Sequence, residues 1–357
     1  MHPTFPPRRR AAGFSLPELL ISVAIGLVIL AGLSTLFLKN TRTQDEIEKA
    51  NRQVENGRYA IDLLALDLRN AGYYGEFDPS VLNAPAALPS LCATTLAALN
   101  DALPLAVQGG DGDNTGLSCL NDVRAATDVL LVRRTRTCIA GAAGCADPAG
   151  SGPLFQASLC NSATELDSGD ATNHYRLKLS TSGLDRHQRD CTGTAVARRY
   201  LTHVYFIANN NQPGDGIPTL KRAELGSDGT TLGYSIVALA EGIENMQIEY
   251  GIDWAASRDG VPDLQVVDPA TAPVAPSVPC AAPACAIANW RSVVAVKLNL
   301  LARNAQPSRG FTDTKTYVLG KAANGDPYTV AAAGDGYKRH VFQVVVNLPN
   351  PAGRSLP

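Results

Sequence analysis

Eight cysteines are the side chains of this sequence most able to form covalent bonds, and all of them follow a long apolar segment near the N-terminus. An even number of cysteines placed in this way is typical of disulfides formed in an oxidising compartment. A zinc site would need CxxC spacings with histidines nearby, and the sequence has none. The pairs Cys138/Cys145 and Cys280/Cys285 could each close a small loop, but the connectivity stays open. The disulfide candidates are Cys92, Cys119, Cys138, Cys145, Cys160, Cys191, Cys280 and Cys285.

The five histidines form no catalytic or metal-binding motif. The sequence contains no HExxH, no G-x-S-x-G and no Walker loop. His203 lies in a strand-like run, where we expect a packed or surface side chain. We therefore predict a protein that is not an enzyme and has no cofactor.

The segment DGDNTGLSCLND (111–122) partly copies the oxygen spacing of a calcium-binding loop. Threonine replaces one carboxylate or amide, aspartate replaces the bidentate glutamate, and no helices are expected on either side. We interpret the segment as a solvated Asp/Gly turn. It remains a weak calcium candidate through Asp111, Asp113, Thr115 and Asp122.

Composition and charge limit the classes of partner. The chain has 357 residues, of which 45% are hydrophobic and 18% charged, as in a folded protein of one large or two ordinary domains. Its formal net charge of −2 gives no electrostatic reason to expect nucleic-acid binding, which usually needs a dense basic face.

The apolar segment 19–38 carries no charge and is long enough to cross a membrane. As a helix rising about 1.5 Å per residue, it would span the ~30 Å hydrocarbon core of a bilayer. A cleavable secretory signal has a shorter apolar stretch and a small-residue cleavage site, and neither fits this segment. Because arginines 8–10 precede it, we predict one span with a cytoplasmic N-terminus and an external remainder.

Glu18 lies directly before this apolar segment. A plain anchor does not need it, because an ionised side chain near the centre of a span costs roughly 2.5–3.5 kcal/mol. Two interpretations stay open: the carboxylate lies at the level of the lipid headgroups, or it meets a positive group on another chain.

The stretch GFSLPELLISVAIG (13–26) resembles the class III signal of type IV prepilins: a basic leader, glycine, phenylalanine, a glutamate five residues in, and an apolar helix. The resemblance implies that a prepilin peptidase cuts between Gly13 and Phe14 and methylates the amine of Phe14. It also implies that Glu18 pairs with the N-terminal amine of a neighbouring subunit during assembly. Such a pair offsets part of the desolvation that each charge would suffer alone.

The helix is expected to continue past the span as an amphipathic segment, 39–70, that packs on a globular part. Its apolar stripe consists of Ile47, Ala50, Val54, Ile61, Leu64 and Leu68. Glycines 72 and 75 can end the helix.

The remainder predicts an antiparallel sheet. Residues 77–121 read as loops with one short helix, and a polar, cysteine-bearing stretch extends to about residue 190. Short apolar or alternating runs separated by Gly/Asn/Asp-rich turns then predict strands, so the fold class is α+β. The Pro/Ala-rich stretch 268–285 is expected to be an exposed loop. The predicted strands are 125–135, 198–209, 218–225, 234–253, 293–303, 315–319 and 340–348.

Four further segments resemble the PilW family of minor pilins: ENGRYAIDLLALDLRNAGYYG, LAEGIENMQIEYGID, NWRSVVAVKLNLLAR and KRHVFQVVVNLPN. The resemblance covers most of the chain outside 77–190. It implies a pilin-like fold divided into a leader (1–13), a transmembrane or filament-core helix (14–38), an amphipathic helix (39–70) and a periplasmic α+β head (71–357).

The same resemblance implies a function in priming type IV pilus assembly and at the pilus tip, in twitching motility or attachment. The implied partners are other minor pilins, the major pilin, a tip adhesin, the inner-membrane assembly platform and the prepilin peptidase. The protein would lie in the inner membrane and, after assembly, in the pilus. Two alternatives stay open: a type II secretion minor pseudopilin of the GspJ kind, and a membrane-anchored periplasmic binding protein or enzyme.

Overall fold

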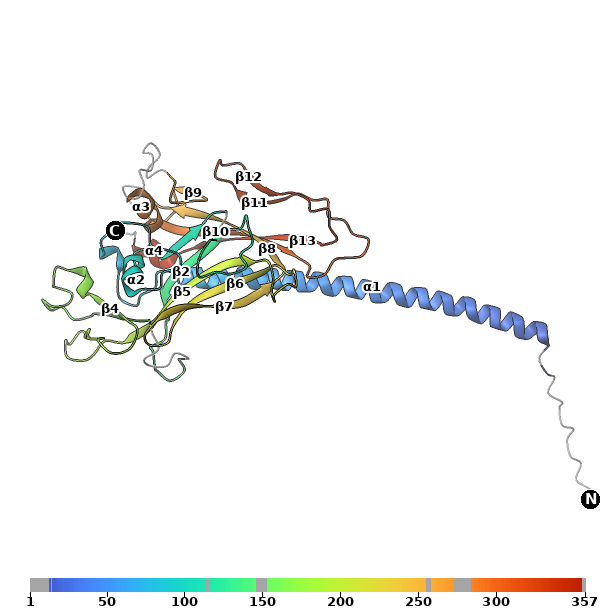
Figure 1. Ribbon diagram of the computed structural model, residues 1–357, viewed down its shortest axis with the longest axis horizontal. Helices are drawn as coiled ribbons and strands as arrows, with labels where there is room; N and C mark the ends of the chain where they lie inside the picture. The colour runs from blue at the N-terminus through green and yellow to red at the C-terminus, as the bar shows by residue number, and fades with distance from the viewer. Residues whose placement is uncertain are drawn as a thin grey trace, which may run out of the picture. The chain divides into compact units, whose positions relative to one another are not determined.

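Helix α1 (Leu16–Arg69) opens the structure, which was obtained as a computed structural model (Figure 1). The structure describes residues 13, 15–112, 116–145, 153–254, 258–272 and 284–354. Just before the first helical turn, the backbone N–H of Ser15 donates to Glu18 Oε2, which is half of a capping box. After Arg69 the chain turns at Gly72, whose φ of +71° favours glycine. The predicted end of the helix near residue 70 is therefore confirmed.

The chain divides into two compact units, Met1–Asn51 and Arg52–Pro357. The described part of the first unit consists of the N-terminal portion of α1 and the residues before it. The second unit, called the head below, contains the rest of α1 and every strand of the described residues.

A seven-stranded antiparallel sheet forms one part of the head. Its strands follow the order β1-β2-β5-β3-β4, and β6 pairs with the second half of β5 and with β7. The long strand β5 organises the sheet because it pairs with β2 along one edge and with both β3 and β6 along the other. The strands are β1 (Val107–Gly110), β2 (Val129–Thr135), β3 (Leu154–Ala157), β4 (Tyr175–Lys178), β5 (Ala197–Ala208), β6 (Thr219–Ser227) and β7 (Leu232–Glu241).

A second antiparallel sheet has the order β13-β10-β8-β9, and a two-stranded hairpin, β11-β12, completes the strands of the described residues. The bounds are β8 (Ile243–Ile252), β9 (Leu264–Val266), β10 (Val293–Arg303), β11 (Tyr317–Lys321), β12 (Pro327–Val330) and β13 (Arg339–Asn347). Short helical elements connect the strands: η1 (Pro79–Val81), α2 (Leu96–Ala102), η2 (Ala171–Asn173), α3 (Ala284–Arg291) and α4 (Pro349–Arg354).

The head is built around the C-terminal part of α1. Ala60, Leu64 and Leu68 are fully buried in one apolar core together with residues of β2, β5, β8 and β10. Farther toward the N-terminus, the face of the helix turned toward the sheet is not apolar. Gln53 Nε2 donates to the carbonyl oxygens of Ala302 (2.8 Å) and Lys338 (2.9 Å).

Gly57 explains why the helix can lie so close to the sheet. A Cβ added at this glycine would overlap the ring of Phe342 on β13. The sequence pattern placed Val54 and Ile61 on the buried stripe, but the structure leaves both half-buried and turns Gln53 and Gly57 inward. Close contact with the sheet selects a small residue there, and a hydrophobicity pattern does not detect that requirement.

The α+β class is confirmed, with a long N-terminal helix, antiparallel sheets and disulfides. Two predictions about the strands were wrong in detail. The run 234–253 is not one strand, because the chain turns at Gly242 (φ +78°) and passes from β7 in the first sheet to β8 in the second. Residues 77–121, read as loops with one short helix, also hold β1, and the polar stretch that extends to about residue 190 holds β3 and β4. These three strands have four residues each and are too short for an alternating pattern to reveal.

Candidate assembly site and the polar clusters of the head

The N-terminal part of α1 is covered with exposed apolar side chains. None of the apolar window that could cross a membrane is buried, and among the described residues α1 is the only helix of that length and composition. Solvent exposure of so much apolar surface is unfavourable. The segment therefore requires a bilayer or other apolar helices around it. The exposed residues are Leu16, Leu19, Leu20, Ile21, Val23, Ile25, Leu27, Val28, Ile29, Leu30, Leu33, Leu36, Phe37 and Leu38.

Glu18 lies in the first turn of α1, where a negative charge interacts favourably with the helix dipole. Its Oε2 accepts hydrogen bonds from the backbone N–H (3.2 Å) and the Oγ (3.1 Å) of Ser15. The carboxylate is thus held toward the start of the chain and stays exposed. Of the predicted cleavage site, Gly13 is exposed with no atom near its Cβ position, and Phe14 lies outside the described residues.

A buried ionic cluster fastens α1 to the seven-stranded sheet. Asp67, on the helix, accepts hydrogen bonds from Arg134 Nε (2.6 Å) and Tyr205 Oη (2.8 Å), and its Oδ2 lies 2.7 Å from His203 Nδ1. Burial raises the pKa of the Asp67 carboxyl, but the hydrogen bonds and positive charges of His203 and Arg134 outweigh burial and hold that pKa well below its usual range. The cluster stabilises one position of the helix on the sheet.

Sequence reasoning did not identify this cluster. It placed His203 correctly in a strand, as a packed or surface side chain, but did not connect it with Asp67, which is 136 residues away. The one available signal was an aspartate on the otherwise apolar face of a helix, next to Leu64 and Leu68. A buried carboxylate needs a partner, so such a residue predicts an ion pair.

The disulfides predicted from the cysteine pattern are present. Cys92 is bonded to Cys119, Cys138 to Cys145 and Cys160 to Cys191. Cys285 is also disulfide-bonded, and Cys280 lies outside the described residues. Each of the three described bonds crosslinks loops in the region 92–191, where regular structure is sparse. Crosslinks of this kind stabilise chains by restricting the unfolded state.

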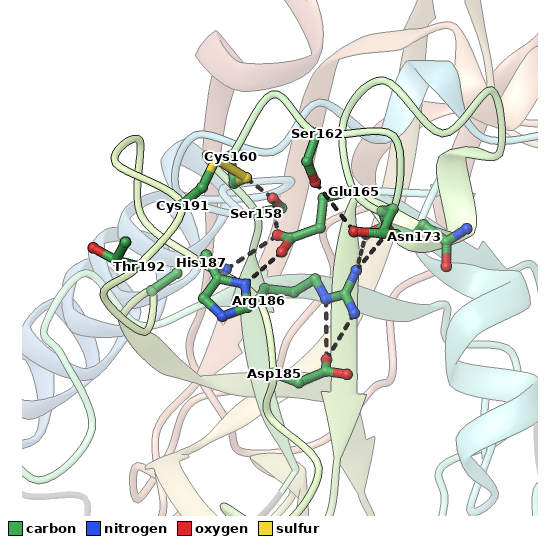
Figure 2. Close-up of polar contacts among 12 residues, drawn as sticks. Ser158, Cys160, Ser162, Glu165, Asn173, Asp185, Arg186, His187, Cys191 and Thr192 are labelled. Atoms are coloured by element: carbon green, nitrogen blue, oxygen red, sulfur yellow. Dashed lines mark hydrogen bonds and ion pairs between the residues drawn. A yellow bond between two sulfur atoms is a disulfide. The ribbon is translucent and has the colours of Figure 1, made fainter.

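Beside the bond Cys160–Cys191 lies a second polar cluster, centred on Glu165 (Figure 2). Ser158 Oγ donates to Glu165 Oε2, and His187 Nδ1 lies 2.5 Å from Glu165 Oε1. Arg186 contacts Asp185 and donates to the carbonyl oxygens of Thr164 and Asn173. The cluster resembles a serine–histidine–acid set in composition only.

In a nucleophilic triad, histidine accepts the proton of serine and the acid orients histidine. Here Ser158 and His187 both bind Glu165, which leaves Ser158 hydrogen-bonded to the acid and not to a base. The arrangement closes a loop and does not activate a nucleophile.

The segment 111–122 gives no support to a calcium site among its described residues. Both oxygens of Asp122 accept hydrogen bonds from the loop after β5, from Asn209 and Asn210. A carboxylate saturated with N–H donors is not oriented to bind a cation. Asp111 is exposed, while Asp113 and Thr115 lie outside the described residues. Within the described ranges, no three His, Cys, Asp or Glu side chains are grouped as a metal site would need.

Comparisons with known proteins give matches in the N-terminal and the C-terminal parts of the chain. Residues 204–350 match the family model PilW, Type IV Pilus-assembly protein W, and residues 8–34 match the prokaryotic N-terminal methylation motif. No curated protein sequence matches the chain. Among solved structures, the chain is similar to the type IV-like pilin TTHA1219 from Thermus thermophilus, with 14% identity and a TM-score of 0.33. That match covers 84% of this chain and 97% of the other.

The family match covers strands β6 to β13 and the last five residues of β5, and the methylation motif covers the start of α1. Pilins are structural subunits and not enzymes. The motif and the apolar helix together indicate a membrane-anchored protein. On these grounds, the chain carries a PilW region of type IV pilus-assembly proteins at residues 204–350 and an N-terminal methylation motif at residues 8–34, as the sequence resemblance predicted.

Proposed function

We propose that this chain is a minor pilin that helps to initiate type IV pilus assembly and takes part in the complex at the pilus tip. The observation that carries the proposal is the contrast between the two parts of α1. Fourteen large apolar side chains between residues 16 and 38 are exposed, whereas the head buries Ala60, Leu64 and Leu68. Removing fourteen such side chains from water would contribute on the order of 20 kcal/mol, taking the lower value for each.

A segment of this kind can be stabilised by lipid before assembly and by the equivalent helices of other subunits afterwards. Packing against helices of similar shape replaces lipid contacts with close side-chain contacts. The small residues Gly26 and Gly32 have open space around their Cβ positions, so neighbouring helices could approach the backbone closely there. This supports a subunit that leaves the bilayer to join a filament.

Processing would begin with cleavage between Gly13 and Phe14 on the cytoplasmic side, followed by methylation of the Phe14 amine. The described geometry is compatible with peptidase access, since Gly13 is exposed and α1 begins only at Leu16. After cleavage, Glu18 would be the fifth residue of the mature chain. Its carboxylate would then lie close in sequence to the new amine and could pair with the amine of a neighbour.

Location and partners follow from that mechanism. The protein would cross the inner membrane once, with its N-terminus in the cytoplasm and its head in the periplasm, where the disulfides form. Partners would be other minor pilins, the major pilin, a tip adhesin, the assembly platform and the prepilin peptidase. The nearly 290 residues that follow α1 would crowd a tight helical filament, so we favour the tip over the shaft. Antibodies to the head should label the ends of sheared pili, and regular labelling of the shaft would contradict this placement.

The deciding experiment measures both the processing of the N-terminus and the assembly of pili. Mass spectrometry of the mature protein should find methylated phenylalanine at position 14, and a deletion strain should lose surface pili while retaining type II secretion. An intact leader, or a cut beyond residue 38, would exclude a pilin. Loss of secretion with normal piliation would favour the GspJ-like alternative, and normal piliation and secretion would favour a periplasmic binding protein or enzyme.

The assembly role of Glu18 has its own test. The variant Glu18→Ala should be processed normally but assemble few pili, because the partner for the methylated amine is lost. Glu55→Ala is the matched control, since Glu55 is an exposed glutamate on the same helix. Equal piliation in both variants would show that the helix is only a tether.

A further inference from the structure

Three arginines line one cavity of the head. Helices α3 and α4, which carry two of them, lie at one end of the head in Figure 1. The cavity has a volume of about 320 Å³. Its arginines come from three separate segments: Arg258 from the loop before β9, Arg291 from the end of α3, and Arg354 from α4. No acidic side chain is among the described residues that line it.

Hydrogen bonds hold each of these arginines in place. Arg291 Nη2 donates to the carbonyl oxygens of Ser80 (3.1 Å) and Leu82 (3.2 Å), and Arg258 Nη2 donates to Ser292 Oγ (3.0 Å). These acceptors are all uncharged. They anchor one nitrogen of Arg291 and one nitrogen of Arg258, and a guanidinium has five N–H donors in all. Arg354 Nη2 donates to the carbonyl oxygens of Gly72 (2.9 Å) and Phe77 (3.4 Å).

One carboxylate lies close to the cavity. Asp78 Oδ1 is 3.2 Å from Arg354 Nε, and the two Asp78 oxygens also accept hydrogen bonds from Ser80. Asp78 can offset one of the three positive charges, which leaves about two. Burial, and then the positive charge of Arg258, lower the pKa of Arg291, as expected for two guanidinium groups close enough to repel each other.

We propose that this cavity binds a phosphate group, with Arg258, Arg291 and Arg354 as its ligands. Arginine binds phosphate oxygens through paired, charge-assisted hydrogen bonds. A phosphomonoester carries about −1.5 to −2 charges at neutral pH, which matches the charge left by the three arginines and Asp78. Donors from three segments suit the tetrahedral oxygens of phosphate better than the single plane of a carboxylate.

The volume also indicates what accompanies the phosphate. The cavity is about ten times larger than the ~30 Å³ that one water molecule occupies, so it can hold a phosphate together with part of the attached molecule. The wall beside the arginines is apolar, formed by Leu103, Pro104 and Val293. The ligand is therefore a phosphate monoester of a small organic group, free in solution or as part of a phosphorylated lipid or polymer. The inference does not depend on pilus assembly.

The test is isothermal titration calorimetry of the full chain in neutral detergent at constant ionic strength. The probes are inorganic phosphate and glycerol phosphate, and triglutamate serves as the carboxylate probe. We expect saturable binding of both phosphates at millimolar or lower concentration. We expect glycerol phosphate to bind more tightly than inorganic phosphate, and the reverse order would overturn the assignment of a monoester.

The variant Arg258→Gln tests the site with little risk to folding, because Arg258 is exposed and its described hydrogen bond goes to one serine. Losing a charge-assisted contact should weaken phosphate binding about 10- to 100-fold. Arg309→Gln is the matched control, since Arg309 is exposed and does not line the cavity.

Three outcomes would overturn the proposal: no heat from either phosphate at millimolar concentration, equal loss of binding in Arg258→Gln and Arg309→Gln, or tighter binding of triglutamate than of glycerol phosphate. The second would mean non-specific attraction, and the third would mean a carboxylate site. The measurement uses purified protein, so a negative result would not contradict the proposed role in pilus assembly. Equally, evidence against that role would not contradict phosphate binding.

Discussion

Replacing Asp67 by asparagine tests how the helix is held on the sheet. Asp67 is buried, and its carboxylate contacts Arg134 and His203 at 2.6 and 2.7 Å. The variant keeps the shape of the side chain but removes its charge, so Arg134 and His203 lose their buried counter-charge. Removing one partner of a buried pair typically costs about 3–5 kcal/mol. We expect the free energy of unfolding of the head to fall by about that amount.

The assay is urea denaturation of the full chain in neutral detergent, followed by tryptophan fluorescence. Both tryptophans of the chain, Trp254 and Trp290, lie in the head, so the signal reports unfolding of that unit. Trp290 is buried and its ring meets Tyr250 edge-on with centroids 4.8 Å apart. Unfolding should therefore change its emission strongly.

Asp62→Asn is the matched control, because Asp62 is an exposed aspartate on the same helix. Surface substitutions of this kind usually change stability by less than about 0.5 kcal/mol. If Asp67→Asn and Asp62→Asn differ by no more than that, the buried cluster does not hold the helix and the reasoning fails. A double variant with Arg134→Met should lose less than the sum of the single losses, because the two residues share one interaction.

The same residue predicts a pH dependence. The folded-state pKa of Asp67 lies below its unfolded value, which is about 3.9 in model peptides. A depressed carboxyl pKa contributes stability that is fully present above the unfolded pKa and is lost as pH falls toward the folded pKa. Below about pH 4, the native head should therefore lose stability more steeply than Asp67→Asn. Parallel curves for the two proteins would contradict the assigned shift.

Three further predictions concern packing, backbone and crosslinks. Gly57→Ala should destabilise the head by about 1–3 kcal/mol, because the added methyl overlaps the ring of Phe342; an unchanged urea midpoint would mean that the ring moves freely. Gly242→Ala should cost about 2 kcal/mol or more, since φ is +78° and the Cβ would meet the carbonyl oxygen of Arg303; a smaller loss in the same assay would show that the turn relaxes. Replacing Cys160 and Cys191 together by alanine should cost about 2–5 kcal/mol and lower the thermal midpoint, and equal midpoints would indicate that the Glu165 cluster alone closes the loop.

Local sequence patterns were sufficient to predict the elements whose characteristic residues all lie within a few helical turns or within one strand. Residues 19–38 predict a membrane helix because an uncharged apolar segment of that length matches the thickness of the hydrocarbon core of a bilayer. Glu18 stands out for the same local reason. The long strands β2, β5, β10 and β13 were found because burial of their side chains imposes β-branched and aromatic residues over seven or more positions. The shorter β1, β3 and β4 offer too few positions for such a pattern, so only pairing with longer neighbours reveals them.

What the sequence alone determined is therefore the class of the protein: its anchor, its processing motif, its disulfide chemistry and the α+β head. The tertiary structure decided which distant residues meet. Asp67 contacts His203, which is 136 residues away in the sequence. Arg258, Arg291 and Arg354 come from three segments and line one cavity. The physical reason is that hydrophobic periodicity records burial along one element, whereas ion pairs and cavities depend on how separate elements pack, and no local pattern carries that information.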